Sequence, residues 1–312
     1  MKTGFCFILI LPLLYITQLM AASDIKVLVS IKPFHSLVSA IMQDVSEPLL
    51  LINGNNSPHS SALRPSSAEN LQQADLVFWG GEILEGFLTK PLQSLASRAK
   101  LVSLQETAGL RLLPLRSGIG WQKHETDSAN DHSAEDETTS TSGTDPHIWL
   151  DPYNAKIISS KIVEILTEMD PQNAQSYRRN GEKYGLRLEL LDRKLKAEMT
   201  KVAETPYMVF HDAYQYFEKR YQLNVVGSMT LHIGFGSSVR RLTAVRKTIQ
   251  KEKIRCIFSE PQFSPKLLQT VIAGTNVKQG TLDPLGAGLE SGAELYFTLL
   301  NNLSHNLSSC LN

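Results

Sequence analysis

The sequence predicts an α/β protein of two lobes, each with a roughly four-stranded parallel sheet flanked by helices, joined by one long connecting helix. Short apolar runs without polar alternation recur along the chain, as expected for strands that are buried on both faces of a sheet. Helical patterns separate these runs, so consecutive strands are expected to lie parallel. Two such alternating halves flank one unusually long apolar stripe, which indicates a single helix between them.

The N-terminus has the pattern of a secretory signal peptide over residues 1–22. Lys2 supplies a positive charge, residues 5–16 are almost all apolar, and Ala21 and Ala22 are small residues near a cleavage site. A membrane anchor is the alternative, but the apolar run is shorter than the roughly 20 residues that a spanning helix needs. We therefore expect an exported mature chain.

The N-terminal lobe is expected over residues 23–171. Pro33 and Pro65 each begin a helical pattern, at the position where a missing backbone N–H is tolerated. A third helical pattern, over residues 82–99, is expected to be interrupted near Pro91. The predicted strands are 25–31, 48–53, 75–79 and 100–104, and the predicted helices are 33–43, 65–73, 82–99 and 154–169.

Residues 116–143 break this pattern and are expected to form a flexible acidic loop. The stretch from Lys123 to Ser142 has almost no apolar side chains and cannot bury a core. His124 and His132 stand there among acidic residues, and both imidazole and carboxylate bind metals. They are weak secondary metal candidates, and a solvated linker is the alternative.

The connecting helix is expected over residues 172–202, with a length of about 46 Å at 1.5 Å per residue. Its apolar positions are spaced by three, four or seven residues and define one stripe. These positions are Tyr177, Tyr184, Leu188, Leu191, Leu195, Met199 and Val202. A coiled coil is the alternative, but strand–helix alternation resumes directly afterwards, which favours a connector between lobes.

The C-terminal lobe is expected over residues 203–312 and repeats the first lobe in outline. The predicted strands are 207–210, 223–228, 254–258 and 277–282, and the predicted helices are 212–221, 238–251, 264–273 and 289–303. Cys256 and Cys310 are the two cysteines of the mature chain, and in an exported protein they indicate one disulfide. Two free thiols are the alternative.

Four side chains follow strand-like runs or lie at proline-marked turns. They are His59, His147, His211 and Asp283. Because ligands of parallel sheets bind beyond the carboxyl ends of the strands, two facing lobes would place all four around one cleft. Three imidazoles with a carboxylate or water suit Zn²⁺, whereas Mn²⁺ prefers more oxygen ligands. For each histidine, the alternative is a hydrogen-bonded surface or helix-cap residue.

The composition argues against several other classes of function. The chain has 31 Lys+Arg and 31 Asp+Glu, so no net charge indicates a nucleic-acid partner or an anionic membrane surface. The sequence has no HExxH, no GxSxG and no phosphate-binding glycine loop, and an enzyme is not expected. A zinc hydrolase remains an alternative, with Glu260 as the candidate general base.

Several local motifs together resemble one family over essentially all of residues 24–312. They are Pro58-His59 with Arg64-Pro65-Ser66, Ala74-Asp75-Leu76-Val77, Asp145-Pro146-His147-Ile148-Trp149-Leu150-Asp151-Pro152, Phe210-His211-Asp212-Ala213-Tyr214, Glu260-Pro261-Gln262-Phe263 and Leu282-Asp283-Pro284-Leu285-Gly286. The chain resembles the solute-binding proteins of zinc and manganese ABC importers, and most of all their periplasmic zinc-binding (ZnuA-type) branch.

This resemblance implies metal ligands at His59, His147 and His211, with Asp283 at the fourth ligand position and water as its alternative. It implies that Zn²⁺ is the transported ligand and that the protein delivers it in the periplasm to an inner-membrane ABC permease and its ATPase. A monomer is expected. The stiff connecting helix predicts only small lobe movement on metal binding.

The residue at position 211 favours zinc over manganese as the bound metal, because manganese members of the family tend to have Glu there and this chain has His211. A manganese or iron importer of the same fold and a surface adhesin are the remaining alternatives.

Two positions depart from the family pattern. Ser61 stands where relatives often have Tyr, and residues 232–237 replace a Pro-Gly segment, which leaves His232 as either an exposed loop residue or an extra weak ligand.

Overall fold

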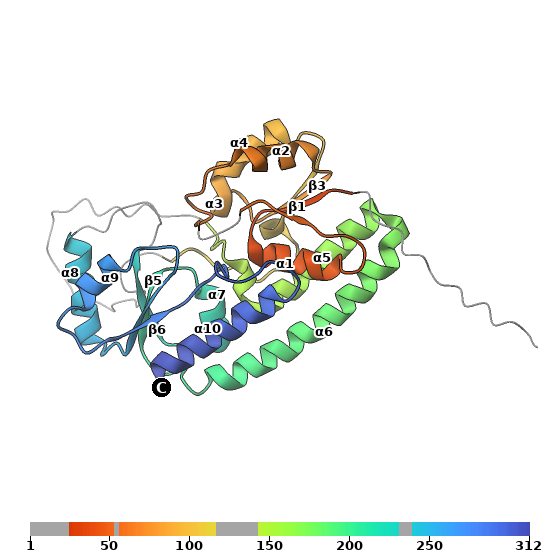
Figure 1. Ribbon diagram of the computed structural model, residues 1–312. Coiled ribbons are helices and arrows are strands. Elements are labelled where there is room, and N and C mark those ends of the chain that lie inside the picture. Colours follow the sequence, from red (N-terminus) through yellow and green to blue (C-terminus); the bar gives the residue numbers. More distant parts are fainter. Residues whose placement is uncertain (1–24, 53–55, 117–142, 231–238) are drawn as a thin grey trace, which may run out of the picture.

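The computed structural model describes residues 25–52, 56–116, 143–230 and 239–312 of the 312-residue chain. Two four-stranded sheets lie above a layer of long helices, as Figure 1 shows, and the predicted fold class is confirmed. Within these ranges, no helix combines the length and the apolar character needed to cross a membrane. The predicted signal peptide, His124, His132 and His232 lie outside the described residues.

The sheet of the N-terminal lobe is parallel throughout, with strand order β2-β1-β3-β4. Its strands are β1 (Val27–Val29), β2 (Leu49–Leu50), β3 (Leu76–Trp79) and β4 (Lys100–Ser103), and its helices are α1 (Lys32–Ile41), α2 (Pro65–Gln73), α3 (Glu82–Glu85) and α4 (Thr89–Leu95). The helix predicted over residues 82–99 is divided by a 3₁₀ turn at Gly86–Leu88. The break precedes Pro91, which lies in the first turn of α4 and there removes no hydrogen bond within the helix.

The sheet of the C-terminal lobe repeats this topology, with order β6-β5-β7-β8 and all pairs parallel. Its strands are β5 (Tyr207–His211), β6 (Val225–Thr230), β7 (Cys256–Ser259) and β8 (Lys278–Thr281), and its helices are α7 (Gln215–Tyr221), α8 (Val239–Lys251) and α9 (Lys266–Ile272). In both lobes the strand order reverses beside the first strand, and ligands of open parallel sheets bind beyond the carboxyl ends of the strands at such a point.

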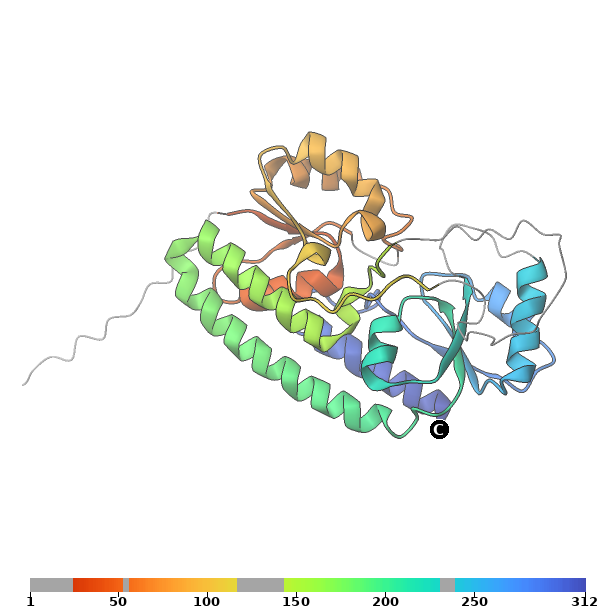
Figure 2. The same ribbon diagram turned by 180° about the vertical axis from the view of Figure 1, so that it is seen from behind.

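Three long helices form the base of the molecule: α5 (Pro152–Met169), α6 (Ala174–Met199) and α10 (Leu295–Leu311). Helix α6 is the predicted connecting helix, and it runs beneath both lobes beside α10 in Figures 1 and 2. A 3₁₀ turn at Pro171–Asn173 precedes it, so the helix is shorter than predicted. The helix predicted over residues 289–303 instead begins at Leu295 and ends at Leu311, because turns occupy the preceding segment.

The two lobes share one hydrophobic core, which crosses the predicted boundaries between domains. A single buried cluster includes Phe34 of α1, Tyr177 of α6, Val209 of β5 and Leu303 of α10. Lys32 of α1 adds a polar link, because its ammonium donates to the carbonyls of Ala287 (2.8 Å) and Leu289 (2.7 Å), just before α10. The lobes are thus joined by the connecting helix and by a second contact between α1 and the segment that enters α10.

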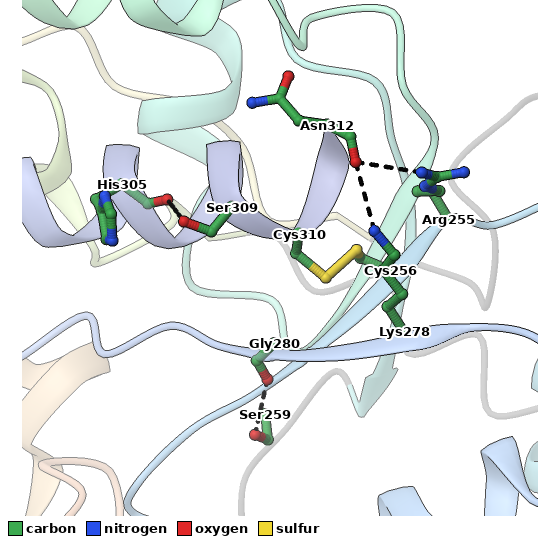
Figure 3. Close-up of a disulfide and its surroundings, with 9 residues drawn as sticks. All are labelled: Arg255, Cys256, Ser259, Lys278, Gly280, His305, Ser309, Cys310 and Asn312. Atoms are coloured by element: carbon green, nitrogen blue, oxygen red, sulfur yellow. Dashed lines mark hydrogen bonds between the residues drawn. A yellow bond between two sulfur atoms is a disulfide. The ribbon is translucent and has the colours of Figure 1, made fainter.

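The predicted disulfide is present between Cys256 of β7 and Cys310 of α10. Figure 3 shows that two cationic side chains also bind Asn312. Arg255 and Lys278 donate hydrogen bonds to its main-chain oxygen at 3.2 and 3.4 Å. The last turn of α10 is therefore fixed to the C-terminal sheet by a covalent bond and two cations.

We expect reduction of this disulfide to lower the free energy of unfolding. The bond joins residues separated by 54 positions, and a loop of this length corresponds to about 4 kcal/mol in the chain-entropy treatment. Urea unfolding with and without dithiothreitol measures the loss. The Cys256→Ser/Cys310→Ser double variant is the control, and it should be less stable and insensitive to reductant. Equal stability of the oxidised and reduced wild type would contradict this account.

Candidate metal centre

His147 is held on a rigid corner by the two aspartates that flank it. Asp145 Oδ1 accepts the backbone N–H of His147 at 2.9 Å and lies 2.7 Å from the ring Nδ1 of the same residue. Asp151 caps α5 by accepting the backbone N–H of Tyr153 at 2.8 Å. Both contacts are the side chain-to-backbone turns that aspartate favours, as the repeated Asp-Pro pattern predicted. The ring therefore points its Nε2 away from Asp145.

His211 is the last residue of β5, and its side chain is buried. Glu260 directly follows β7, the neighbouring strand, and its Oε1 lies 3.4 Å from Nδ1 of His211. Because the carboxyl ends of adjacent parallel strands meet at one sheet edge, these two side chains are brought together. Sequence reasoning treated Glu260 only as a candidate base and missed this contact, although its place directly after a strand was the signal.

His59 lies on a turn that its own neighbours close. The Ser57 carbonyl accepts the backbone N–H of Ser60 at 3.2 Å and the hydroxyl of Ser61 at 2.8 Å. Ser61, which departs from the family pattern, thus stabilises the turn beneath His59. The ring Nε2 of His59 lies 3.2 Å from Nε2 of His147.

The three histidines converge at the seam between the lobes. His59 and His147 come from the N-terminal lobe and His211 from the C-terminal lobe. One nitrogen of each ring lies within 4.8 Å of the others, and the ring centroids are 5.0 to 5.5 Å apart. Zinc binds histidine nitrogen at about 2.0–2.1 Å in a tetrahedral site. Small side-chain adjustments would therefore suffice for one ion to contact all three rings.

Apolar groups enclose these rings. Trp149 packs against His147, with ring centroids 5.4 Å apart, and donates its indole N–H to the Pro284 carbonyl at 2.8 Å. The pocket is lined by Ser57, Pro58, His59, His147, Trp149, His211, Glu260, Gln262, Phe263, Pro284 and Leu285. Such a wall limits water access and strengthens the electrostatic interactions of a bound ion.

Asp283 does not join the three-histidine group. Its carboxylate accepts four hydrogen bonds, of 2.6 to 3.0 Å, from the Gln262 side chain and from the backbone N–H groups of Leu285, Gly286 and Ala287. In this conformation it orders the loop that supplies Pro284 and Leu285 to the pocket wall. Its predicted role as fourth ligand stays a prediction.

The electrostatics favour a neutral His147 and a more basic His211. Burial lowers the pKa of His147 well below its ordinary value, and the positive charge of Arg116 contributes to the lowering. Burial also lowers the pKa of His211, but the Glu260 carboxylate together with Asp212 and Asp145 raises it, and the net shift is upward. Burial raises the pKa of Asp145 to about 7, against the stabilising hydrogen bond from the His147 backbone.

Comparison with known proteins identifies a consistent set of relatives. The model of the ZnuA family, described as zinc-uptake complex component A, periplasmic, matches residues 27–310. The chain is 40% identical over 304 residues to the high-affinity zinc uptake system protein ZnuA of Brucella abortus (strain 2308), covering 91% of each chain. It is 34% identical over 289 residues to the protein of the same name from Yersinia pestis, again covering 91% of each.

Solved structures with the same fold hold zinc in one case, a ZnuA deletion mutant, and Mn²⁺ in another. A crystal structure of ZnuA superposes with a TM-score of 0.76 at 23% identity, covering 93% of this chain and all of that one. The protein FpvC from Pseudomonas aeruginosa in complex with Mn²⁺ also gives 0.76, at 20% identity, covering 93% of this chain and 99% of that one. At these identities, the likeness establishes the fold.

We expect zinc affinity to fall with decreasing pH, beginning above the ordinary histidine value of about 6.5. The pKa of His211 is raised, so protons compete with metal there at a higher pH than at a free imidazole. His147, whose pKa is lowered, adds little competition in this range. Competition with a chromogenic chelator between about pH 8 and pH 5.5 measures the profile.

The control for this profile is Glu260→Gln, which removes the carboxylate that raises the pKa of His211. Its onset of affinity loss should move to lower pH, whatever its affinity at neutral pH. A wild-type affinity that is constant down to about pH 6 would contradict the assignment of His211 as a metal-binding group.

Proposed function

The chain belongs to the periplasmic zinc-uptake component A (ZnuA) family, and from this we propose that it captures Zn²⁺ in the periplasm and delivers it to an inner-membrane ABC permease with its ATPase. The convergence of His59, His147 and His211 at one point of the seam carries this proposal. The protein acts as a binding protein and not as an enzyme, and it works as a monomer.

Each of the two deeper histidines presents Nε2 to the metal because a carboxylate lies at its Nδ1. Asp145 holds Nδ1 of His147, and Glu260 lies against Nδ1 of His211. A carboxylate behind a ligating imidazole fixes its tautomer and orientation and increases its basicity. Glu260 therefore supports a ligand, which explains its burial without a catalytic role.

Three imidazole nitrogens favour zinc over manganese. Zinc is a borderline ion that accepts nitrogen ligands in a tetrahedral site, whereas Mn²⁺ prefers carboxylate, carbonyl and water oxygens. Three protein ligands leave a fourth position, which water or Asp283 would fill. Because Asp283 already accepts four hydrogen bonds, water completes the shell at lower cost.

Delivery follows from the position of the site at the seam. His59 and His147 move with one lobe and His211 with the other, so a small separation of the lobes removes one of three ligands. A permease that docks on both lobes could release the ion in this way, without a large rearrangement of the binding protein. Neutral imidazoles carry no charge that would retain the ion once this geometry is lost.

We expect His211→Glu to reduce the preference for Zn²⁺ over Mn²⁺, because it exchanges a nitrogen ligand for oxygen ligands. Competitive titration of the mature protein with both metals measures the preference. His305→Glu makes the same substitution at an exposed histidine of α10 and should leave the preference unchanged.

The outcomes of this titration separate the candidate functions. A wild type that prefers Mn²⁺ would keep the family and overturn the choice of metal, in favour of a manganese importer. A wild type that binds neither metal tightly would overturn the three-histidine site itself.

We also expect only a small change in shape on zinc binding. The lobes share a continuous buried core, and α6 passes beneath both without interruption. Hydrogen bonds from Lys32 and Ser36 of α1 to the segment before α10 add a second connection. Small-angle scattering of the apo and zinc-loaded protein should give nearly equal radii of gyration. A marked compaction on zinc binding would argue for hinge closure instead.

A further inference from the structure

A buried ion cluster lies beside the metal site and has no part in the ligand set. Arg116 places its guanidinium between two carboxylates of the C-terminal lobe. Its Nε donates to Asp212 Oδ2 at 3.1 Å, its Nη2 donates to Asp212 Oδ1, and the same Nη2 donates to Glu218 Oε2 at 2.7 Å. The side chains are 16%, 8% and 3% exposed, respectively, so the cluster is largely shielded from solvent.

The cluster is connected to His211 through Asp212. Asp212 is the next residue after His211, at the carboxyl end of β5, and the Ala213 N–H closes a turn back onto the His211 carbonyl at 2.9 Å. The fork formed by Arg116 and Asp212 therefore holds the backbone on which the His211 ring is mounted. A guanidinium–carboxylate pair with two donors constrains orientation as well as distance.

The cluster is connected to His147 through the chain segment that contains Arg116. Arg116 lies in a segment that pairs with the chain entering His147, through a bridge between Pro114 and Thr144 and a hydrogen bond from Asp145 N–H to the Leu113 carbonyl at 2.8 Å. The same aspartate holds the backbone and ring of His147. Arg116 is thus three residues beyond Leu113, whose carbonyl holds the Asp145 support of His147, while its guanidinium holds Asp212, the residue after His211.

Tyr216 of α7 adds a second contact between the segment that contains Arg116 and the C-terminal lobe. Its hydroxyl accepts the Leu113 N–H at 3.1 Å and donates to the Asp145 carbonyl at 2.9 Å. The paired segments 113–116 and 144–145 are therefore fixed to the C-terminal lobe at two points, one ionic through Arg116 and one neutral through Tyr216. Both points lie between the segments that carry His147 and His211.

We propose that Arg116 is a positioning residue that sets the separation of His147 and His211 across the seam, and thereby the zinc affinity of the protein. This inference rests on the proposed function. Without the guanidinium, Asp212 and Glu218 would be buried carboxylates without their main compensating charge, which is costly. They would move towards water, and the turn after His211 would lose its anchor.

The test compares zinc affinity and stability in Arg116→Ala, Arg116→Lys and Asp212→Asn. Loss of groups that support metal ligands typically weakens metal binding about 10- to 100-fold, and we expect a loss of this size for Arg116→Ala. Arg116→Lys should recover part of it, because an ammonium keeps the charge without the two-donor fork. Chelator competition gives the affinity, and thermal unfolding of the apo protein gives the stability.

Arg187→Ala is the matched control. Arg187 also makes a two-donor pair, with Glu294, and joins α6 to the start of α10 away from the histidines. This variant should lower the unfolding temperature while its zinc affinity stays within about 3-fold of wild type, a change below the range expected for ligand supports. If Arg116→Ala changes zinc affinity no more than Arg187→Ala does, Arg116 has a structural role only and the inference fails.

A double-variant cycle tests the route through Asp212. Because Arg116 is proposed to act on His211 through this carboxylate, Arg116→Ala combined with Asp212→Asn should bind zinc about as weakly as the weaker single variant. Additive losses would contradict the route. If Arg116→Ala does not fold, Arg116→Lys and Asp212→Asn carry the test. A wild type without zinc affinity would instead overturn the proposed function, so the two failures are distinguishable.

Discussion

The arrangement of the histidine rings depends most on the pairing of a buried carboxylate with a buried imidazole, which occurs once in each lobe. Asp145 supports His147, and Glu260 supports His211. Each pair removes charge or polarity from water at considerable cost, which only close contact and further hydrogen bonds offset. At Asp145 the His147 backbone N–H supplies part of that compensation, and Glu260 is placed beside His211 by the neighbouring ends of β7 and β5. In the proposed metal site, these two rings are therefore oriented before a metal arrives.

Such a site needs lobes that do not drift relative to one another. A drift of one lobe would separate His211 from His59 and His147, whose ring nitrogens now lie within 4.8 Å of one another. The shared core, the uninterrupted α6 and the contacts of Lys32 oppose that drift. The disulfide acts further away, fixing the end of α10 to β7, so that the helix that touches α1 is also anchored in the C-terminal sheet.

Sequence reasoning found what depends on local pattern and on chain order. Apolar runs located the strands, and strand ends and proline-marked turns together singled out the three histidines, because parallel strands put ligands at one edge. It placed α10 wrongly, since Leu289 continues the apolar pattern but belongs to a turn. It could not find the Arg116 cluster, because the partners lie 96 and 102 residues further along the chain. No spacing rule links residues so far apart without the fold.

Asp283 is a carboxylate that orders the pocket wall and does not join the three histidines. Three of its four hydrogen bonds shape residues 285–287, and the Ala287 carbonyl of that loop accepts from Lys32 of the opposite lobe. The aspartate therefore supports both the wall of the pocket and the link across the seam. Bringing it to the metal would require breaking these bonds and loosening that link. In the proposed site, the three histidines are accordingly the side chains that would bind the ion, since Asp145 and Glu260 orient two of them without using the Asp283 carboxylate.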